Sequence, residues 1–475
     1  MRPWTFPVPL SSDLPEPLFL QIAQAISRDI QRGRLKSGAA LPGSRTLARD
    51  LGVHRNTVLA AYRELSAEGW ILGEGRATRV TQDVPAASEP GLYSSSLPGY
   101  DLAPSPETWS PSSGNRAWPL VGTPDLRLFP AREFGQAFRR ALRNQALLDY
   151  GDPRGNARLR EELARLLSEM RGLASRPDQI LVTAGSQMAL TLIARTLVRP
   201  GDRVAIEDPG YPHARMAFQD AGARVVPVPI DAEGLRIDVL ERIAETGPFR
   251  AVFVTPHHQY PTTVTMSAAR RLRLLDLAAR RRIAVVEDDY DFEFHYGEYP
   301  VMPLASRDPG GVVIYMGTLS KILAPGLRLG FVSAPQPVVD ALASRRTGMD
   351  FQGNQIVEQA VADLLAEGVL QRHARKMRRV YAARRDALGK GLRDHLAGAL
   401  SFELPSGGMS IWAQAAPEVD LEGWLDRARQ RGLDHPAGQL LDFRGTPLQG
   451  LRLGFSRRNE EELDLAVRVL AETLA

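Results

Sequence analysis

Hydrophobic residues follow two different patterns along the 475-residue chain. In residues 17–32 an apolar side chain recurs every fourth position, which predicts one face of a helix. From about residue 121 onward, short uninterrupted apolar runs alternate with helical stretches, a pattern typical of mostly parallel strands covered on both faces. The runs are Ile180–Val182, Arg203–Ile206, Arg224–Val228, Ala251–Val254, Ile283–Val286 and Val312–Tyr315.

Between these runs, Gln187–Leu197 and Ala268–Arg281 are predicted helices. We therefore expect an α/β fold with a mostly parallel central sheet. The end of the chain, from about residue 350, is more helical and is expected to form a smaller α+β subdomain.

Three regions follow from these patterns. Residues 14–80 predict a compact helical domain with a short β ending, and residues 121–475 predict the large α/β domain. Residues 81–120 contain 7 Pro, 8 Ser and 3 Gly, a composition typical of a linker. An extended strap packed on the large domain is the alternative, and it would use the aromatic residues Tyr93, Tyr100, Trp109 and Trp118.

Composition excludes several classes of protein. Hydrophobic residues make up 44% and charged residues 24%, as in soluble globular proteins. The chain has no Cys, which excludes disulfides, thiolate catalysis and Cys-based zinc sites, favours a cytoplasmic location and leaves no metal site predicted. No apolar run approaches about 18 residues, so no membrane helix is expected. The first ten residues lack the apolar core of a signal peptide.

Charge is distributed unevenly. Residues 1–80 hold 11 Lys and Arg against 7 Asp and Glu, whereas the remaining 395 residues hold 48 of each sign. A basic region on a neutral body points to a polyanion as partner of the N-terminal domain. Only four of the 59 basic residues are Lys, and Lys, unlike Arg, can act as an amine nucleophile.

The segment LPGSRTLARDLGVHRNTVLAAYRELSAEGWI, residues 41–71, predicts two helices joined by a turn at Gly52. Ser44 can cap the first helix, which is expected to run through Leu51. The second helix starts near His54 and presents side chains that hydrogen-bond base edges and phosphates. Those side chains are His54, Arg55, Asn56 and Thr57. Residues 71–80 predict a hairpin in which Arg76 and Arg79 are available to DNA.

A generic helical bundle would show part of this pattern, but the whole segment resembles the winged-helix domain of the GntR regulator superfamily. The resemblance implies dimeric binding to DNA half-sites, with contacts from Arg45, Arg55, Asn56 and Thr57. The hairpin GEGRATRV departs from the usual Gly-rich wing of that family.

Three motifs in the large domain suit a phosphate-bearing cofactor held by an amine. Lys321 lies in MGTLSKILAPGLRLGF, close to hydroxyl side chains and to Arg328. A predicted strand ends in acidic and aromatic residues in the second motif, AVVEDDYDFEF, residues 284–294. TAGSQMAL, residues 183–190, predicts a strand, a Gly-Ser turn and a helix N-terminus that binds phosphate.

In their order and spacing these motifs resemble the fold-type I pyridoxal phosphate aminotransferases over residues 120–470. Together with the GntR-type domain, they resemble the MocR/GabR family of regulators. The resemblance makes Lys321 the lysine that forms the Schiff base (imine) with pyridoxal phosphate, with Asp288 on the pyridine nitrogen and Tyr290 on the phenolate oxygen. The implied phosphate ligands are Ser186, Gln187, Thr318 and Arg328, and Tyr211 would stack on the ring.

An amino-acid-like effector is implied by the same resemblance, with Arg452 receiving its carboxylate and Arg215 adding a second anionic contact. One departure concerns HHQYPTTVTMS, in which Thr263 stands where the family usually has Gly. A β-branched residue disfavours positive φ, so this loop is expected to differ. His257 and His258 precede it. They could touch the cofactor or the effector, but loop histidines more often face solvent, and that is the expectation here.

The first function hypothesis is a homodimeric transcription regulator that binds operator DNA and senses pyridoxal phosphate and an amino compound. An active aminotransferase with an accessory DNA-binding domain uses nearly the same residues, and a sensor of pyridoxal phosphate alone is a third possibility.

Overall fold

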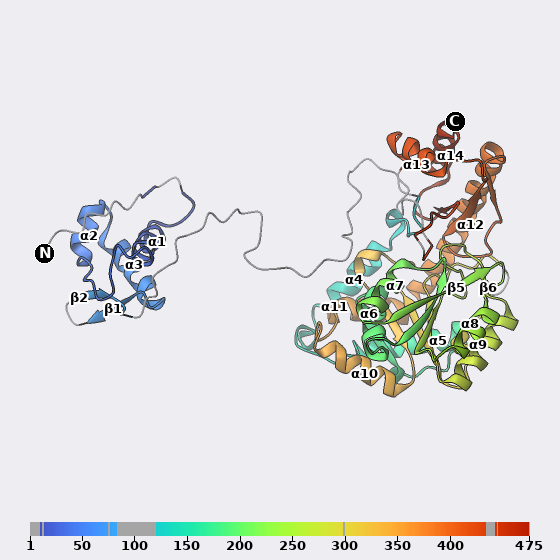
Figure 1. The fold of residues 1–475 in the computed structure, drawn as a ribbon, viewed down its shortest axis with the longest axis horizontal. Helices are drawn as coiled ribbons and strands as arrows, with labels where there is room; N and C mark the ends of the chain where they lie inside the picture. The colour runs from blue at the N-terminus through green and yellow to red at the C-terminus, as the bar shows by residue number, and fades with distance from the viewer. Residues whose placement is uncertain are drawn as a thin grey trace. The chain divides into compact units, whose positions relative to one another are not determined.

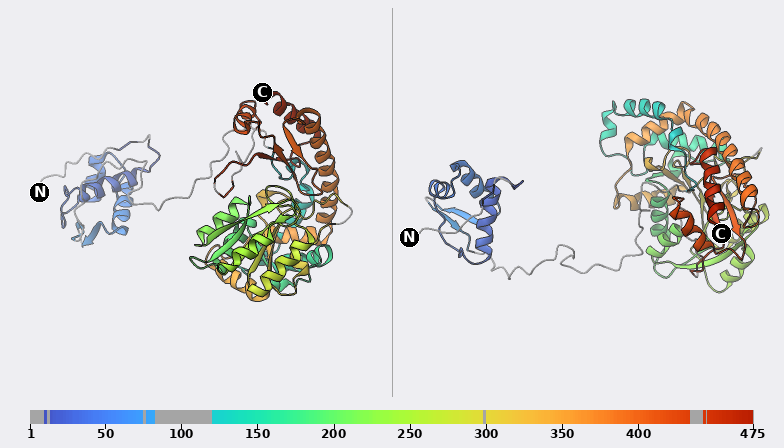
Figure 2. Two further views of the ribbon diagram at one scale, coloured as in Figure 1. Left: turned by 45° about the vertical axis from the view of Figure 1, so that its right-hand side comes forward. Right: turned by 90° about the horizontal axis from the view of Figure 1, so that it is seen from above.

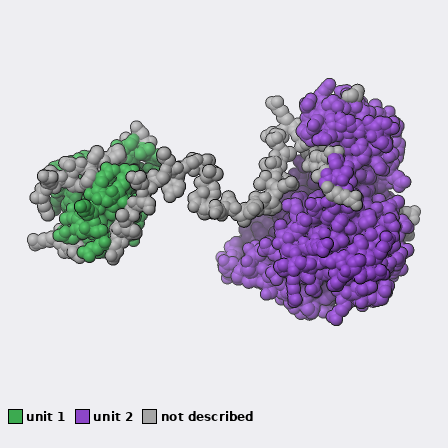
Figure 3. All heavy atoms as spheres, viewed as in Figure 1, with its two compact units in different colours: residues 1–110 green, residues 111–475 purple. Residues whose placement is uncertain are grey.

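The computed structural model describes residues 10–11, 14–74, 77–82, 120–297, 300–433, 442–443 and 445–474. The chain divides into two compact units, residues 1–110 and 111–475 (Figure 3). Most of the predicted linker, residues 83–119 with its four aromatic side chains, and the predicted DNA contact Arg76 lie outside the described residues.

Unit 1 contains the predicted helix-turn-helix followed by a hairpin (Figure 1). Gly52 ends the second helix with a φ of 66°, a left-handed conformation that glycine adopts without strain. Strands β1 and β2 pair antiparallel. A core that includes Ile22, Ile26, Val58 and Leu65 holds the helices together. The elements are α1 Leu18–Gln31, α2 Ser44–Leu51, α3 Arg55–Ala67, β1 Ile71–Glu74 and β2 Ala77–Val80.

Unit 2 is built on an eight-stranded sheet of order β3-β10-β9-β8-β7-β4-β5-β6. The central strands β9, β8, β7, β4 and β5 are parallel, whereas β10 is antiparallel to both neighbours and β6 to β5. The mostly parallel sheet predicted from the apolar runs is therefore confirmed. The strands are β3 Ile180–Thr183, β4 Arg203–Asp208, β5 Arg224–Asp231, β6 Gly234–Leu235, β7 Ala251–Val254, β8 Ala284–Asp289, β9 Val313–Thr318 and β10 Gly330–Ser333.

Helices cover both faces of this sheet because both faces of its central strands are apolar. One core joins the sheet to α6, α7 and α10, and the opposite face packs on α5 and α11 at one end and on α8 and α9 at the other. The helices are α4 Ala131–Ala141, α5 Ala157–Arg171, α6 Ser186–Leu197, α7 Pro212–Asp220, α8 Ile237–Glu245, α9 Ala268–Arg281, α10 Gln336–Thr347 and α11 Gln355–Ala366. Short 3-10 helices lie at Leu126–Leu128, Gln145–Leu148, Pro177–Gln179, Leu304–Arg307 and Pro325–Leu327.

The predicted C-terminal α+β subdomain is present, but it begins later than residue 350. Helix α11 still packs on the large sheet through Val361 and Leu365. The long helix α12 leads into a three-stranded sheet, β11-β12-β13, whose core surrounds the buried Trp424. The elements are α12 Val369–Leu396, β11 Leu400–Phe402, β12 Ser410–Ala415, α13 Leu421–Gln430, β13 Gly450–Gly454 and α14 Glu460–Thr473.

Within the described ranges, no helix is both long enough and apolar enough to cross a membrane. The same ranges hold no group of three or more acidic or histidine side chains that could bind a metal ion.

Candidate functional site

The predicted lysine and acid lie at the carboxyl ends of two neighbouring parallel strands. Asp288 is the penultimate residue of β8, and Lys321 follows β9 by three residues. Ligands of parallel α/β sheets bind at this edge. The Lys321 Nζ donates a hydrogen bond to the carbonyl oxygen of Gly122, at 3.0 Å.

Burial disfavours the charged form of both members of this pair. Asp288 is buried, and burial together with the neighbouring Asp289 and Asp291 raises its pKa to about 7. Burial also lowers the pKa of Lys321, and the nearby Arg452 guanidinium adds to that effect. A protonated ring nitrogen beside Asp288 would supply the positive charge that the buried carboxyl lacks.

A second part of the site surrounds the N-terminus of α6. The helix begins at Ser186 and Gln187, directly after Gly185, whose φ is 84°. The Arg328 Nη2 donates to the carbonyl oxygen of Ala184 at 3.0 Å, and a Cβ built on Gly185 would lie 3.1 Å from the Arg328 Cζ. Free helix N–H groups and a guanidinium therefore meet around a residue without a side chain, which fits a phosphate.

Thr318 lies at the same edge, but its hydroxyl is engaged locally. The Thr318 Oγ1 accepts from the Ser320 N–H at 3.1 Å and donates to the Leu329 carbonyl at 3.3 Å. Thr318 is a predicted phosphate ligand, but its side chain stabilises the turn between β9 and β10.

Tyrosine rings and Arg452 form a third part of the site. The Tyr290 hydroxyl donates to the carbonyl of His258 at 2.8 Å and accepts from the Arg452 Nη2 at 3.2 Å. The Arg452 guanidinium lies 5.0 Å from the Tyr260 ring centroid, and that ring meets Tyr211 edge-on at 5.2 Å. The structure therefore brings Tyr290, Tyr211 and Arg452 together and adds Tyr260, a residue of the HHQYPTTVTMS motif to which no role had been assigned.

Arg215, on α7, belongs to a different contact. Its guanidinium lies 5.0 Å from the centroid of the Phe443 ring. Among the described residues, no hydrogen bond or ion pair joins Arg215 to Arg452 or Lys321.

The expectation that His257 and His258 face solvent is wrong, because both side chains are buried. The His258 Nδ1 lies 2.7 Å from the Asp291 Oδ1, and the His257 Nδ1 lies 3.3 Å from the Asp289 Oδ1. Gly407 of the C-terminal subdomain packs so closely on the His258 ring that a Cβ there would overlap it. The subdomain, distant in sequence, therefore removes the loop from water.

The expected change in the loop at Thr263 does not occur at that residue. Thr263 has a φ of 63°, the conformation that glycine would take, and its N–H donates to the Gln259 carbonyl at 2.7 Å. The loop geometry is kept at the expense of backbone strain, which costs about 1–2 kcal/mol for a residue with a Cβ.

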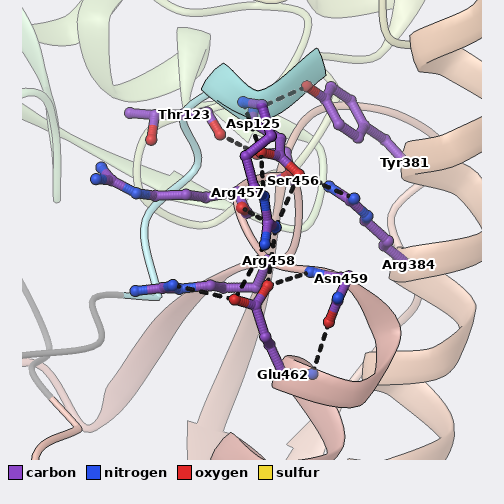
Figure 4. Close-up of polar contacts among 10 residues, drawn as sticks. Thr123, Asp125, Tyr381, Arg384, Ser456, Arg457, Arg458, Asn459 and Glu462 are labelled. Carbon is purple, nitrogen blue, oxygen red and sulfur yellow. Dashed lines mark hydrogen bonds and ion pairs between the residues drawn. The ribbon is translucent and has the colours of Figure 1, made fainter.

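Sequence reasoning missed the segment 120–125, which begins at the predicted domain boundary. Its carbonyls accept from the Gly454 N–H at 3.0 Å and from the Ser456 Oγ at 2.7 Å. Asp125 fixes the far end, because its carboxylate accepts from Arg384 at 3.0 Å and its N–H donates to the Tyr381 hydroxyl (Figure 4). This segment has no ionisable group before Asp125, so its role could not be inferred from chemistry.

In unit 1, predicted DNA contacts gather where α2 and α3 begin. Arg45, His54, Arg55 and Asn56 are exposed, and Thr57 is half-buried. The Arg55 Nε donates to the Ser44 Oγ at 3.3 Å, which joins the two helix starts. The His54 Nδ1 accepts from the Asn56 N–H and caps α3.

Comparisons with known proteins agree with both units. Residues 18–80 match the model for bacterial regulatory proteins of the gntR family, and residues 121–470 match aminotransferase class I and II. The chain is 33% identical to a probable rhizopine catabolism regulatory protein, MocR, of Rhizobium meliloti, over 94% of this chain and 92% of that protein. It is also 33% identical to the pyridoxine biosynthesis regulator PdxR of Corynebacterium glutamicum, over 82% of each.

Solved aminotransferases share the fold of unit 2. The multiple substrate aminotransferase of Thermococcus profundus is 30% identical, with a TM-score of 0.71 over 76% of this chain and 92% of its own. The α-aminoadipate aminotransferase LysN of Thermus thermophilus, solved with a phosphopyridoxyl-leucine, is 31% identical, with a TM-score of 0.69 over 74% and 90%.

Proposed function

Because this chain belongs to the MocR/GabR family, in which a GntR-type domain precedes an aminotransferase-like domain, we propose that it couples recognition of an amino compound to operator binding. The chain is a pyridoxal-phosphate-dependent transcription regulator. The observation that carries the proposal is the convergence of Lys321, Asp288 and Arg452 at one edge of the sheet.

The residues present fit pyridoxal phosphate. Lys321 would hold its aldehyde carbon, Asp288 its ring nitrogen and Tyr290 its phenolate oxygen, with the Tyr211 ring stacked on the pyridine. The phosphate would lie on the helix start, against Ser186, Gln187 and Arg328, with Thr318 shaping the turn beside it. When bound, the cofactor supplies an electrophilic carbon that condenses with amines and an electron-withdrawing ring.

The side chains of this site prepare it for an amine. Burial lowers the pKa of Lys321, so a larger fraction of the amine is neutral, and a neutral amine is the reactive form. Arg452 would receive the carboxylate of the effector after exchanging its present partners, the Pro261 carbonyl and the Tyr290 hydroxyl. Arg215 is the proposed second anionic contact.

In the proposed function, residues 14–80 bind DNA, residues 81–120 link the domains and residues 121–475 bind the effector. The regulator would act as a homodimer in the cytoplasm, since two winged helices are needed to read two half-sites. Exposed Arg45, His54, Arg55 and Asn56, together with Thr57 and Arg76, are the proposed DNA contacts.

The near-ultraviolet and visible absorption spectrum tests the cofactor assignment. We expect the absorption band of an imine in the purified protein reconstituted with pyridoxal phosphate, and its absence in Lys321→Ala. Lys390→Ala is the matched control, because Lys390 is an exposed lysine paired with Asp394 far from the site. An unchanged band in Lys321→Ala, or no band in the wild type, would refute the assignment.

The effector assignment has a separate test. Arg452→Ala should retain the cofactor band but need a higher concentration of amino acids to shift it, because the guanidinium that receives their carboxylate is gone. An unchanged titration would favour a sensor of pyridoxal phosphate alone. Transfer of the amino group to an added keto acid at enzymatic rates would favour the aminotransferase alternative.

A further inference from the structure

The first half of α12 carries an unusual run of positive charge. Residues 369–385 contain seven Lys and Arg and no Asp or Glu. Figure 2 shows α12 as a long helix at the edge of unit 2. Four of the seven cations are exposed, and their spacings of three, four and seven residues place them on one side of the helix. This cationic face consists of Arg372, Arg375, Lys376 and Arg379.

The other three cations of the run are used inside the fold. Arg378 donates to the Glu293 carbonyl and to His295, Arg384 binds Asp125, and Arg385 pairs with Asp386. The cationic face differs from them, because no carboxylate lies within 4.0 Å of its four side chains in the part of the chain that the structure describes.

Nearby acids do not neutralise this face. Glu367, just before α12, gives its carboxylate to Arg140, and only its backbone carbonyl accepts from Arg372, at 3.1 Å. Glu133 interacts electrostatically with His373 of α12.

Like charges at these spacings destabilise a helix. The same helix forms a favourable pair four residues apart near its end, between Lys390 and Asp394. The first half of α12 therefore lacks a stabilising arrangement that the second half has. A polyanion seated on the cationic face would remove the repulsion among its four side chains.

We propose that the cationic face of α12 binds the phosphate backbone of duplex DNA that flanks the operator. This inference rests on the proposed function, in which unit 1 recognises the operator. The face spans about 10 Å of helix, and the same length of duplex carries about six phosphate charges. Contacts of Arg and Lys with phosphates need no particular base sequence.

Chain length permits the contact. Residues 82 and 120 are joined by 38 peptide steps, which can span at most about 130 Å. Unit 1 can therefore occupy its site while unit 2 lies on adjoining duplex.

The test measures binding of the full-length protein to its own footprinted operator, cut to the footprint or extended by about three helical turns of duplex on each side. The test variant is R372Q/R375Q/K376Q/R379Q. The control variant, R195Q/R224Q/R281Q/R345Q, loses the same charge from exposed positions on α6, β5, α9 and α10. Retained circular dichroism and cofactor absorbance establish folding.

The plot of log K against log salt has a negative slope. Loss of four phosphate contacts should make that slope shallower by up to about 3.6. The advantage of the wild type over the α12 variant on the extended operator should therefore be up to about 150-fold larger at 50 mM than at 200 mM salt. The variant should gain nothing from the flanks. The short operator should bind wild type and variant alike, and the control variant should match the wild type.

Equal slopes and equal flank dependence in the wild type and the α12 variant would overturn the inference. So would selective loss of binding to phosphatidylglycerol vesicles or to RNA with flanking DNA unaffected. Arg55→Ala distinguishes a failure of this inference from a failure of the proposed function. If the wild type and Arg55→Ala bind the short operator equally, the proposed function fails, whatever α12 does.

Discussion

The buried carboxyl of Asp288 should make the stability of the cofactor-free protein depend on pH in a predictable direction. Its pKa is about 7 in the folded protein, against 3.8 for an ordinary Asp, because burial and two neighbouring carboxylates oppose its charge. Between these values the folded state keeps a proton that the unfolded state releases. The unfolding free energy must therefore fall as pH rises from about 4 to about 7.

The size of the effect follows from the gap between the two values. A gap of about three pKa units, at about 1.4 kcal/mol each, amounts to about 4 kcal/mol. Asp288→Asn has nearly the same shape and cannot ionise. The variant should match the wild type below about pH 4 and exceed its stability by up to about 4 kcal/mol at about pH 8.

Urea unfolding of cofactor-free protein at several pH values measures this difference. Glu207 and Glu287 also have raised pKa values, about 7 and about 8. Both are present in either protein, so the effect of their own burial cancels in the comparison. The control is Asp340→Asn, an exposed carboxylate 3.9 Å from Arg154, for which we expect no pH-dependent difference. A difference between the wild type and the Asp288→Asn variant that stays constant from about pH 4 to about pH 8 would refute the reasoning.

Two further substitutions test strain and buried charge. Thr263→Gly should raise the unfolding free energy by about 1 kcal/mol, because glycine adopts a φ of 63° without the clash of a Cβ; a lower urea midpoint would contradict this. Asp125→Ala should lower the unfolding free energy by about 3–5 kcal/mol, because the buried Arg384 loses the carboxylate with which it forms an ion pair. The double variant Asp125→Leu/Arg384→Met should recover part of that loss, and no recovery would argue against the ion pair as the cause.

Much of the fold could be predicted because the apolar runs are local. Ala251–Val254 and Ala268–Arg281 have in the structure the bounds that the sequence pattern predicted. The start of the C-terminal subdomain could not be predicted in this way. Helical propensity places α11 correctly as a helix, but only packing against α5 assigns it to the large sheet.

For the site, the predictable residues were those in motifs at strand ends, where Asp288 and Lys321 meet through sheet topology alone. Contacts made by segments from elsewhere could not be predicted. The Gly122 carbonyl reaches Lys321 across 199 positions, and Gly407 covers His258 across 149, so no local pattern records either contact. Burial of the two histidines was missed for the same reason.

The net charge of a region does not show how its charged residues divide between the core and the surface. Beyond residue 80 the acidic and basic residues are equal in number, and this predicted a polyanion partner for the N-terminal domain only. Burial divides them unequally, since the buried residues that the structure describes beyond residue 80 include nine Asp and Glu but five Arg. The acidic residues are concentrated near the end of β8, where Asp288 and Glu287 have raised pKa values and carry less than full charge near neutral pH. Among the described residues beyond residue 80, the exposed and half-buried charges are therefore positive in sum, and α12 carries a compact part of them.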